Sequence, residues 1–261
     1  MFSYNFTQWL LFFYIYCFIG WVIESIIVSV EHRKLVNRGF LRGPYLPLYG
    51  FGALTILFIC LPFKEEPILV YLFGLIGTTV LEYFTGWAME ACLKTKYWDY
   101  SNQKFNYKGR ICLTSSLFWG FLSLLMIYVL HKPIEKAVLT LYDEHILIFT
   151  IIVITISCLF VSDMVYAFKT ALDLNKLLEK ITKLKAEAAT IRKQISEDKS
   201  NKKAHLHTRL QNLKDEHKAT IEKIGFFRAN MVKAHPNAQS LRFNEALQDV
   251  RERLNNRKKS R

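Results

Sequence analysis

The sequence predicts an all-α protein: a polytopic membrane helix bundle of about five spans, followed by a cytoplasmic coiled-coil hairpin tail. Apolar residues make up 51% of the 261 residues and gather in long runs. The net charge is +1 over residues 1–168 and +12 over residues 169–261. In the basic part, apolar residues follow heptad spacing. We therefore divide the chain into a transmembrane domain, residues 1–168, and a basic tail, residues 169–261.

Five apolar stretches are long enough to span a bilayer, which takes roughly 20 residues of helix at about 1.5 Å each. They lie near residues 7–30, 46–63, 67–92, 111–131 and 145–168. With five spans, the basic segments 31–45 and 93–110 share one side of the membrane with the tail. Because Lys and Arg concentrate on the inner side, we expect these segments in the cytoplasm and the N-terminus outside.

The first residues, MFSYNF, carry no positive charge, so the pattern is not that of a cleavable signal peptide and the first span is expected to be retained. The five cysteines show no CxxC spacing. We interpret them as small packing residues. We expect no disulfide, no metal site and no cofactor.

Two segments share the pattern Gly-Trp-x-x-Glu: GWVIE at residues 20–24 and GWAME at residues 86–90. Each is followed by a basic loop and then by a returning apolar stretch with an aromatic-Gly-Phe triplet. This order predicts a parallel internal repeat, with units of about 7–63 and 67–131 related by an axis along the membrane normal. Chance similarity in an aromatic-rich chain is the alternative.

Four acidic residues lie within the expected spans: Glu24, Glu82, Glu90 and Asp163. A charge at the bilayer centre costs at least about 2.5–3.5 kcal/mol, so such residues are usually functional or paired. The expected spans contain no Lys or Arg. The acids must therefore be protonated, bind a cation, or meet loop arginines that fold inward. We interpret them as an intramembrane polar site, with Glu82 the deepest; ion pairs that merely lock loops to helix ends are the alternative for Glu24 and Glu90.

The two basic loops carry Asn, Gly and Arg in the same order. Arginines beside backbone amides can pair with the acids or hold a phosphate or carboxylate. We therefore expect an anion-binding or head-group-binding region in these loops, and a solvated positive loop with aromatic anchors is the alternative. Its candidate residues are Asn37, Arg38, Arg42, Trp98, Asp99, Asn106 and Arg110.

Four segments within residues 13–121 (GWVIES, NRGFLRGPYLPLYGFG, YWDYS and FNYKGRICLTSSLFWG) resemble the bacterial family of CmpB-like permeases, or type IV ABC transporters. The tail segment FFRANMVKAHPNAQSLRFNEAL, residues 226–247, also resembles that family. The resemblance implies a transporter permease in the bacterial cell membrane. The sequence has no GxxxxGK[ST] phosphate loop, so the ATPase would be a separate subunit. The motif residues are Glu24, Asn37, Arg38, Gly39, Gly43, Pro44, Gly50, Glu90, Trp98, Asp99, Asn106, Gly109 and Arg110.

The tail begins with a heptad seam that runs from Leu177 to Ile195 and resumes at Leu206 after a polar stretch, residues 196–204. This predicts an antiparallel helical hairpin, with an interrupted long coiled coil as the alternative. The hairpin could support a homo-oligomer. The positive charge favours anionic lipids, by about 1 kcal/mol per basic residue near the surface. Few aromatic residues are present for stacking on bases, so we expect no nucleic acid.

Three functions fit these patterns. The first, which we adopt, is a transporter permease component without its own ATPase. The second is a membrane-embedded enzyme or binding protein that acts on lipid head groups, with Glu24 or Glu90 as a base and the loop arginines on the phosphate. The third is a non-catalytic membrane scaffold. The sequence shows no established catalytic motif, and it does not specify a substrate.

Overall fold

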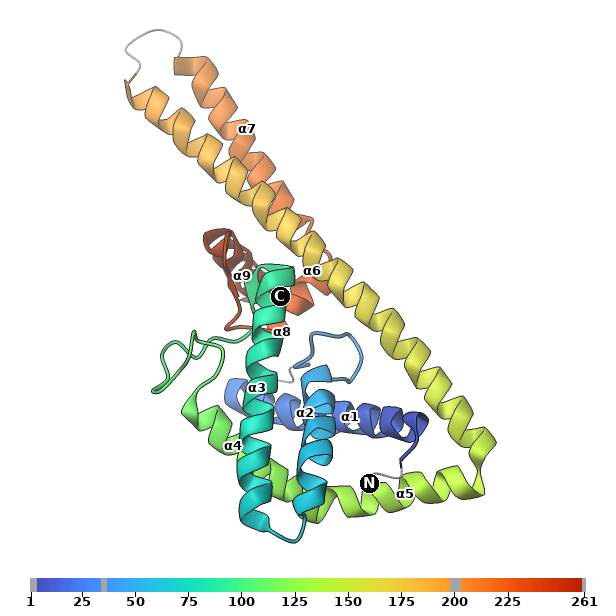
Figure 1. Cartoon of the computed structure of the whole chain (residues 1–261). Coiled ribbons are helices and arrows are strands. Elements are labelled where there is room, and N and C mark those ends of the chain that lie inside the picture. Colours follow the sequence, from blue (N-terminus) through green and yellow to red (C-terminus); the bar gives the residue numbers. More distant parts are fainter. Residues whose placement is uncertain (1–3, 34–36, 198–202, 260–261) are drawn as a thin grey trace.

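The computed structural model describes residues 4–33, 37–197 and 203–259, and these are mainly helical (Figure 1). The all-α fold class is therefore confirmed. The helices are α1 (Phe6–His32), α2 (Pro47–Cys60), α3 (Pro67–Leu93), α4 (Leu113–Leu125), α5 (His131–Glu144), α6 (Ile146–Glu197), α7 (Lys203–Glu222), α8 (Phe226–Ala234) and α9 (Asn244–Lys259). A 3₁₀ turn (Leu61–Phe63) extends α2, and a π-helical turn (Met126–Leu130) joins α4 to α5. The described residues also form two short strands, β1 (Thr95–Lys96) and β2 (Gln239–Ser240).

Four of the described helices are long and apolar enough to cross a membrane: Phe6–Val30, Pro67–Leu93, Leu113–Glu144 and Ile146–Ser196. The apolar helix Pro47–Phe63, at the expected second span, is shorter. The count of five spans therefore stays a prediction. The segment after residue 131, which the sequence predicts to lie outside the spans, is helical, because α4 continues through the π-helical turn into α5.

Helix α3 has one buried and one exposed face. Its buried residues recur every four positions: Val70, Gly74, Thr78, Glu82 and Gly86. Large apolar residues two positions away recur with the same spacing and are exposed: Ile68, Leu72, Ile76, Val80 and Phe84. A continuous exposed apolar stripe is costly in water and suits a lipid environment. The buried stripe faces the helices that form the pocket described below.

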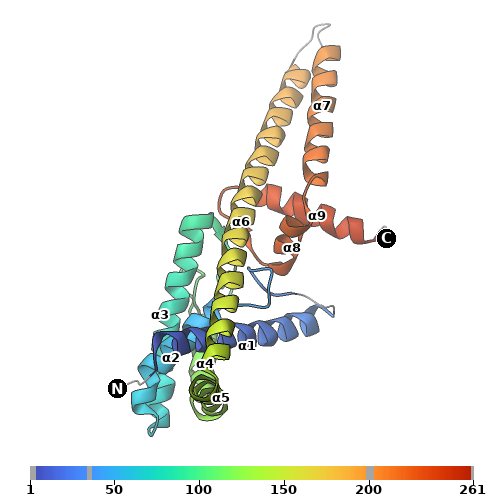
Figure 2. The same cartoon turned by 90° about the vertical axis from the view of Figure 1, so that its right-hand side faces the viewer.

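The helices of the membrane part are not uniformly aligned. Figures 1 and 2 show α2 and α3 running side by side, whereas α1 crosses α2 at a steep angle. The two helices can pack closely at this crossing because Gly20 of α1 has no Cβ, and a Cβ there would collide with the ring of Tyr49 in α2. Helices α1 and α3 end in the same way, at Arg33 and Lys94, which both adopt left-handed backbone conformations.

Helix α6 is 52 residues long and passes through residue 168 without interruption. The expected boundary between the membrane domain and the tail thus lies inside one helix. Beyond that point α7 returns alongside α6 (Figures 1 and 2). Leu184 and Ile191 of α6 pack with Leu210 and Leu213 of α7 in a buried cluster. The hairpin form of the tail is therefore seen directly, whereas its coiled-coil packing and cytoplasmic location remain predictions.

The end of the chain folds back onto the end of α3. Strand β1 pairs with β2 in antiparallel register, with Thr95 opposite Ser240 and Lys96 opposite Gln239. Leu93 and Tyr97 belong to one buried cluster with residues of α6, α8 and α9, among them Val250, whose side chain is fully buried. The C-terminal segment, residues 226–259, is therefore packed against the membrane part of the chain.

Candidate functional site

A pocket of about 440 Å³ lies where α1 and α3 approach their C-terminal ends. Its lining comes from the helices α1 to α4, from α6, from both basic loops and from the C-terminal segment. Four of the predicted site residues line it: Glu24, Glu82, Arg38 and Trp98. Most of the remaining lining is aromatic or aliphatic, and it includes Tyr49, Tyr97, Tyr100, Trp119 and His235.

Glu82 lies on the buried face of α3 and is only 4% exposed. It accepts hydrogen bonds from the Tyr100 hydroxyl at 3.2 Å, the Ser115 hydroxyl at 3.1 Å and the Trp119 Nε1 at 3.2 Å. All three donors are neutral. Among the described residues, no Lys, Arg or His forms an ion pair with Glu82. This carboxyl group is therefore stabilised by hydrogen bonds from neutral groups rather than by an ion pair with a basic side chain.

Glu24, near the end of α1, meets Arg38 from the first basic loop at 3.7 Å. The Tyr49 hydroxyl donates to the other oxygen of the same carboxylate at 2.9 Å. The Arg38 guanidinium also donates to the carbonyl of Ala234 at 2.7 Å. The first loop thus connects an acid of the membrane part to the C-terminal segment.

Glu90, near the end of α3, pairs with Arg110 of the second basic loop. Arg110 donates from Nε to Glu90 Oε1 at 3.1 Å and from an Nη to Oε2 at 2.6 Å, and a second Nη reaches the Tyr83 hydroxyl at 3.2 Å. The Glu90 carboxylate raises the pKa of Arg110, because it stabilises the charged guanidinium by hydrogen bonding. A bidentate pair of this kind fixes the orientation of the Arg110 side chain relative to Glu90 and also neutralises the charge of the Glu90 carboxylate.

Asp163, on α6, is paired differently. Its carboxylate accepts the backbone N–H groups of Arg42 at 3.2 Å and Gly43 at 2.8 Å. The Arg42 guanidinium turns away and lies between two rings, 3.0 Å from the centroid of Tyr166 and 3.4 Å from that of Phe227. Arg38 and Arg110 thus meet acids through their side chains, whereas Arg42 meets one only through its backbone.

The remaining predicted loop residues hold the loops in shape. Asn37 accepts from Trp21 Nε1 at 2.6 Å and donates to the carbonyl of Arg42 at 3.2 Å. Asn106 binds the backbone of its own loop, including the N–H of Gly109 at 3.2 Å. Gly109 has a φ of 68°, and a side chain there would collide with Asp99. We assign these contacts a positioning role.

The C-terminal segment contributes His235 to the pocket lining, and this residue is buried. Its ring packs edge-on against Tyr97, with the centroids 5.0 Å apart. Burial, together with the nearby Arg38 and Arg251 charges, lowers the pKa of His235 to about 3. His235 is therefore neutral at pH 7.

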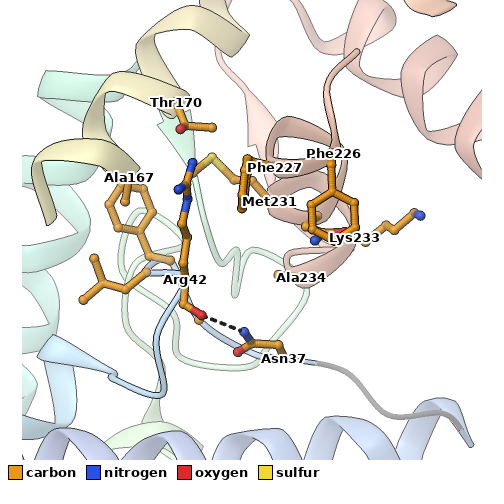
Figure 3. Close-up of a pocket in the computed structure, with 13 residues that line it drawn as sticks. Asn37, Arg42, Ala167, Thr170, Phe226, Phe227, Met231, Lys233 and Ala234 are labelled. Carbon is orange, nitrogen blue, oxygen red and sulfur yellow. Dashed lines mark hydrogen bonds between the residues drawn. The ribbon is translucent and has the colours of Figure 1, made fainter. Parts of the chain in front are cut away.

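A second pocket, also about 440 Å³, lies between the first basic loop, α6 and α8 (Figure 3). Arg42 extends from the loop toward Thr170, beside Phe227. Lys233 and Asn37 also line it, and the described lining residues include no acid. Phe226, at its edge, is 71% exposed. This pocket is therefore a basic one with exposed aromatic side chains.

Sequence reasoning placed the four acids but missed the neutral partners of Glu82. Tyr100 and Ser115 lie 18 and 33 residues from Glu82 along the chain, and Trp119 lies 37 residues away. No local spacing links these residues. His235 was also missed; its only signal was the tail segment that resembles the permease family.

The long apolar helices with exposed apolar faces, and the polar residues buried between them, are those of an α-helical membrane protein. The profile of the family described as "Putative ABC-transporter type IV" matches residues 11–168, so the chain belongs to this family. No curated protein and no solved structure shows a significant match to the chain.

Proposed function

We propose that the chain is the membrane-spanning permease component of a transporter whose ATPase is a separate subunit. The observation that carries this proposal is the pocket around Glu82, which is lined by several helices and, through His235, by the C-terminal segment. Binding sites between helices of a membrane bundle are where transported molecules are held. Membership of the family supports the same function.

The proposed orientation follows the basic loops: the two loops, the hairpin and the C-terminal segment face the cytoplasm, and the N-terminus lies outside. In this orientation His235 and the Arg38–Ala234 hydrogen bond lie on the cytoplasmic side of the pocket. An ATPase that docks on the loops or on the C-terminal segment would then bind next to residues that line the pocket.

The test is purification of the tagged chain in mild detergent from its native host at native expression, with mass spectrometry of the copurifying proteins. The proposal predicts a stoichiometric ATPase subunit. The same purification is made with the variant Val250→Asp, which disrupts the packing of the C-terminal segment. This variant is expected to remain in the membrane but to lose the ATPase subunit. Copurification without any ATPase, together with no ATP-driven flux in proteoliposomes, would contradict the proposal.

A second candidate function, the binding of lipid head groups, is favoured by the basic pocket of Figure 3. Arg42 and Lys233 supply positive charge there, and the exposed Phe226 and Phe227 suit the membrane–water interface. The guanidinium of Arg42 is held in place by its two flanking rings, so its orientation toward an anionic head group costs little entropy. Anionic lipid is the proposed occupant.

The lipid proposal predicts that anionic phospholipid copurifies with the chain and is reduced several-fold in the variant Arg42→Gln/Lys233→Gln. Lys223→Gln, an exposed lysine outside the pocket, is the matched control and should not change the lipid content. Equal lipid content in the wild type, the double variant and the Lys223→Gln control would contradict the lipid proposal. Lipid extracts that do not differ between wild-type and deletion cells would argue against an enzyme acting on lipid.

A further inference from the structure

We infer that the pocket around Glu82 binds a monovalent organic cation with a bulky apolar body, and that Glu82 supplies the countercharge. The inference rests on the proposed permease function in one respect: it takes the bound cation to be the molecule that the permease carries. It concerns binding alone, however, and can be tested on the purified chain without its ATPase.

The first argument is the charge balance of the described lining. The Glu24 carboxylate is compensated by Arg38. His235 is neutral at pH 7 because its pKa is about 3. Glu82 remains with neutral hydrogen-bond donors only. An ionised carboxylate in an apolar pocket is costly without a countercharge, so either a proton or a ligand with one positive charge must neutralise Glu82, and such a ligand takes the place of the proton when it binds.

The second argument is the aromatic lining. Tyr49 and Trp119, whose ring centroids lie 5.4 Å apart, stand beside the Glu24 and Glu82 carboxylates and donate hydrogen bonds to them. Tyr97, Trp98 and Tyr100 line the same pocket. The faces of tyrosine and tryptophan rings attract organic ammonium groups. Aromatic rings beside a carboxylate are the arrangement that recognises such cations.

The third argument excludes other ligands. A volume of about 440 Å³ suits a small organic molecule rather than a bare metal ion. Glu24 and Glu82 are the only acids among the described lining residues, and no group of three His, Cys, Asp or Glu residues in the described part of the chain could hold a hard cation. An anion would meet Glu82 without compensation, because Arg38 is already engaged by Glu24 and by the carbonyl of Ala234.

The experiment is isothermal titration of the purified full chain with benzyltrimethylammonium and with the larger tetraphenylphosphonium. The neutral isostere neopentylbenzene, in which carbon replaces the charged nitrogen, controls for apolar partition into detergent. The variant Glu82→Gln keeps the shape of the side chain and removes its charge. Glu65→Gln, which changes an exposed acid in the turn before α3, is the matched control.

The inference predicts saturable binding of at least one cation by the wild type and by Glu65→Gln. Binding should be at least about tenfold weaker in Glu82→Gln, and the neutral isostere should show no saturable binding. It is overturned if neither cation binds, or if the isostere binds to the wild type as tightly as the cations do. Unchanged binding by a folded Glu82→Gln protein would overturn it as well. A failure here leaves the copurification of an ATPase untouched, so the two proposals fail separately.

Discussion

At the residue scale, the ion pair between Arg110 and Glu90 is bidentate, and the two side chains are only 13% and 11% exposed. Removing the guanidinium leaves the Glu90 carboxylate without its partner in a mostly buried place. We expect Arg110→Ala to lower the free energy of unfolding by about 2–3 kcal/mol. The measurement is reversible unfolding in mixed detergent micelles.

Two controls make that result specific. Lys64→Ala removes one member of a highly exposed pair with Glu65, and it should cost at most about 1 kcal/mol. The double variant Arg110→Ala/Glu90→Gln should recover part of the loss, because no charge is then left unpaired. Equal effects of Arg110→Ala and Lys64→Ala would show that the Arg110 pair is not structurally important.

His235 gives a prediction about pH. Its pKa is about 3 in the folded chain and about 6.5 in an unfolded one, so the unfolded state binds more protons between these values. The stability that the folded chain gains from the neutral His235 is therefore complete above about pH 6.5 and is lost as the pH falls. The packing of the C-terminal segment should weaken by at most about 1.4 kcal/mol per pH unit between pH 6 and 4.

Amide exchange of the peptide 226–243, corrected for its intrinsic rates, at pH 7 and pH 5 measures this effect. In His235→Gln the additional loss of protection at pH 5 should disappear. If the variant and the wild type lose the same protection, another group must titrate in this range.

Part of the site could be predicted from residue types alone. Acids in apolar segments need compensation, so Arg38 and Arg110 were foreseeable partners of such acids once their loops were found. Which arginine meets which acid depends on the loop paths, and a backbone partner such as the N–H of Gly43 leaves no trace in the sequence. The role of Arg42, stacked between two rings, was likewise hidden, because Phe227 lies 185 residues further on.

At the element scale, periodicity was informative wherever one helix buries one face. Glu82, Gly86 and Glu90 lie four residues apart, a spacing that puts them on one face of α3; Glu82 and Gly86 are buried there and Glu90 is half-buried. The heptad seam predicted the contact between α6 and α7. Periodicity gave no information on where α6 leaves the membrane, because the helix continues through the change in composition.

The hairpin supplies a test at this scale. Ile191 is 3% exposed and packs in the cluster with Leu210 and Leu213. Ile191→Ala should destabilise the hairpin locally by about 2–4 kcal/mol, because it leaves a cavity between α6 and α7. Amide exchange of α7 is the measurement, and Gln194→Ala on the exposed face is the control. Unchanged exchange in Ile191→Ala would mean that α7 does not depend on this packing.

At the scale of the whole molecule, the least foreseeable feature is the return of the chain's end to the membrane part. Composition separated residues 169–261 from the rest, but β2 pairs with β1 and Ala234 accepts from Arg38. Pairings between segments so far apart are set by tertiary packing, which single-sequence patterns do not record. The tail therefore contributes the side chain of His235 to the lining of the pocket around Glu82 and also forms part of the surface of the molecule.

The most direct test of this account is a disulfide between β1 and β2, since its central claim is that the C-terminal segment packs against the end of α3 and lines the pocket. Lys96 and Gln239 are direct partners in the antiparallel register, a spacing that permits a disulfide. The variant Lys96→Cys/Gln239→Cys is made with the exposed Cys92 and Cys158 replaced by serine.

The account predicts rapid and nearly complete cross-linking under mild oxidation in native membranes, seen as faster migration in a non-reducing gel. The pair Lys96→Cys/Gln194→Cys, with its second cysteine on the hairpin, should not cross-link. Equal, slow cross-linking of both pairs would show that the C-terminal segment does not lie on the pocket, and would contradict the account.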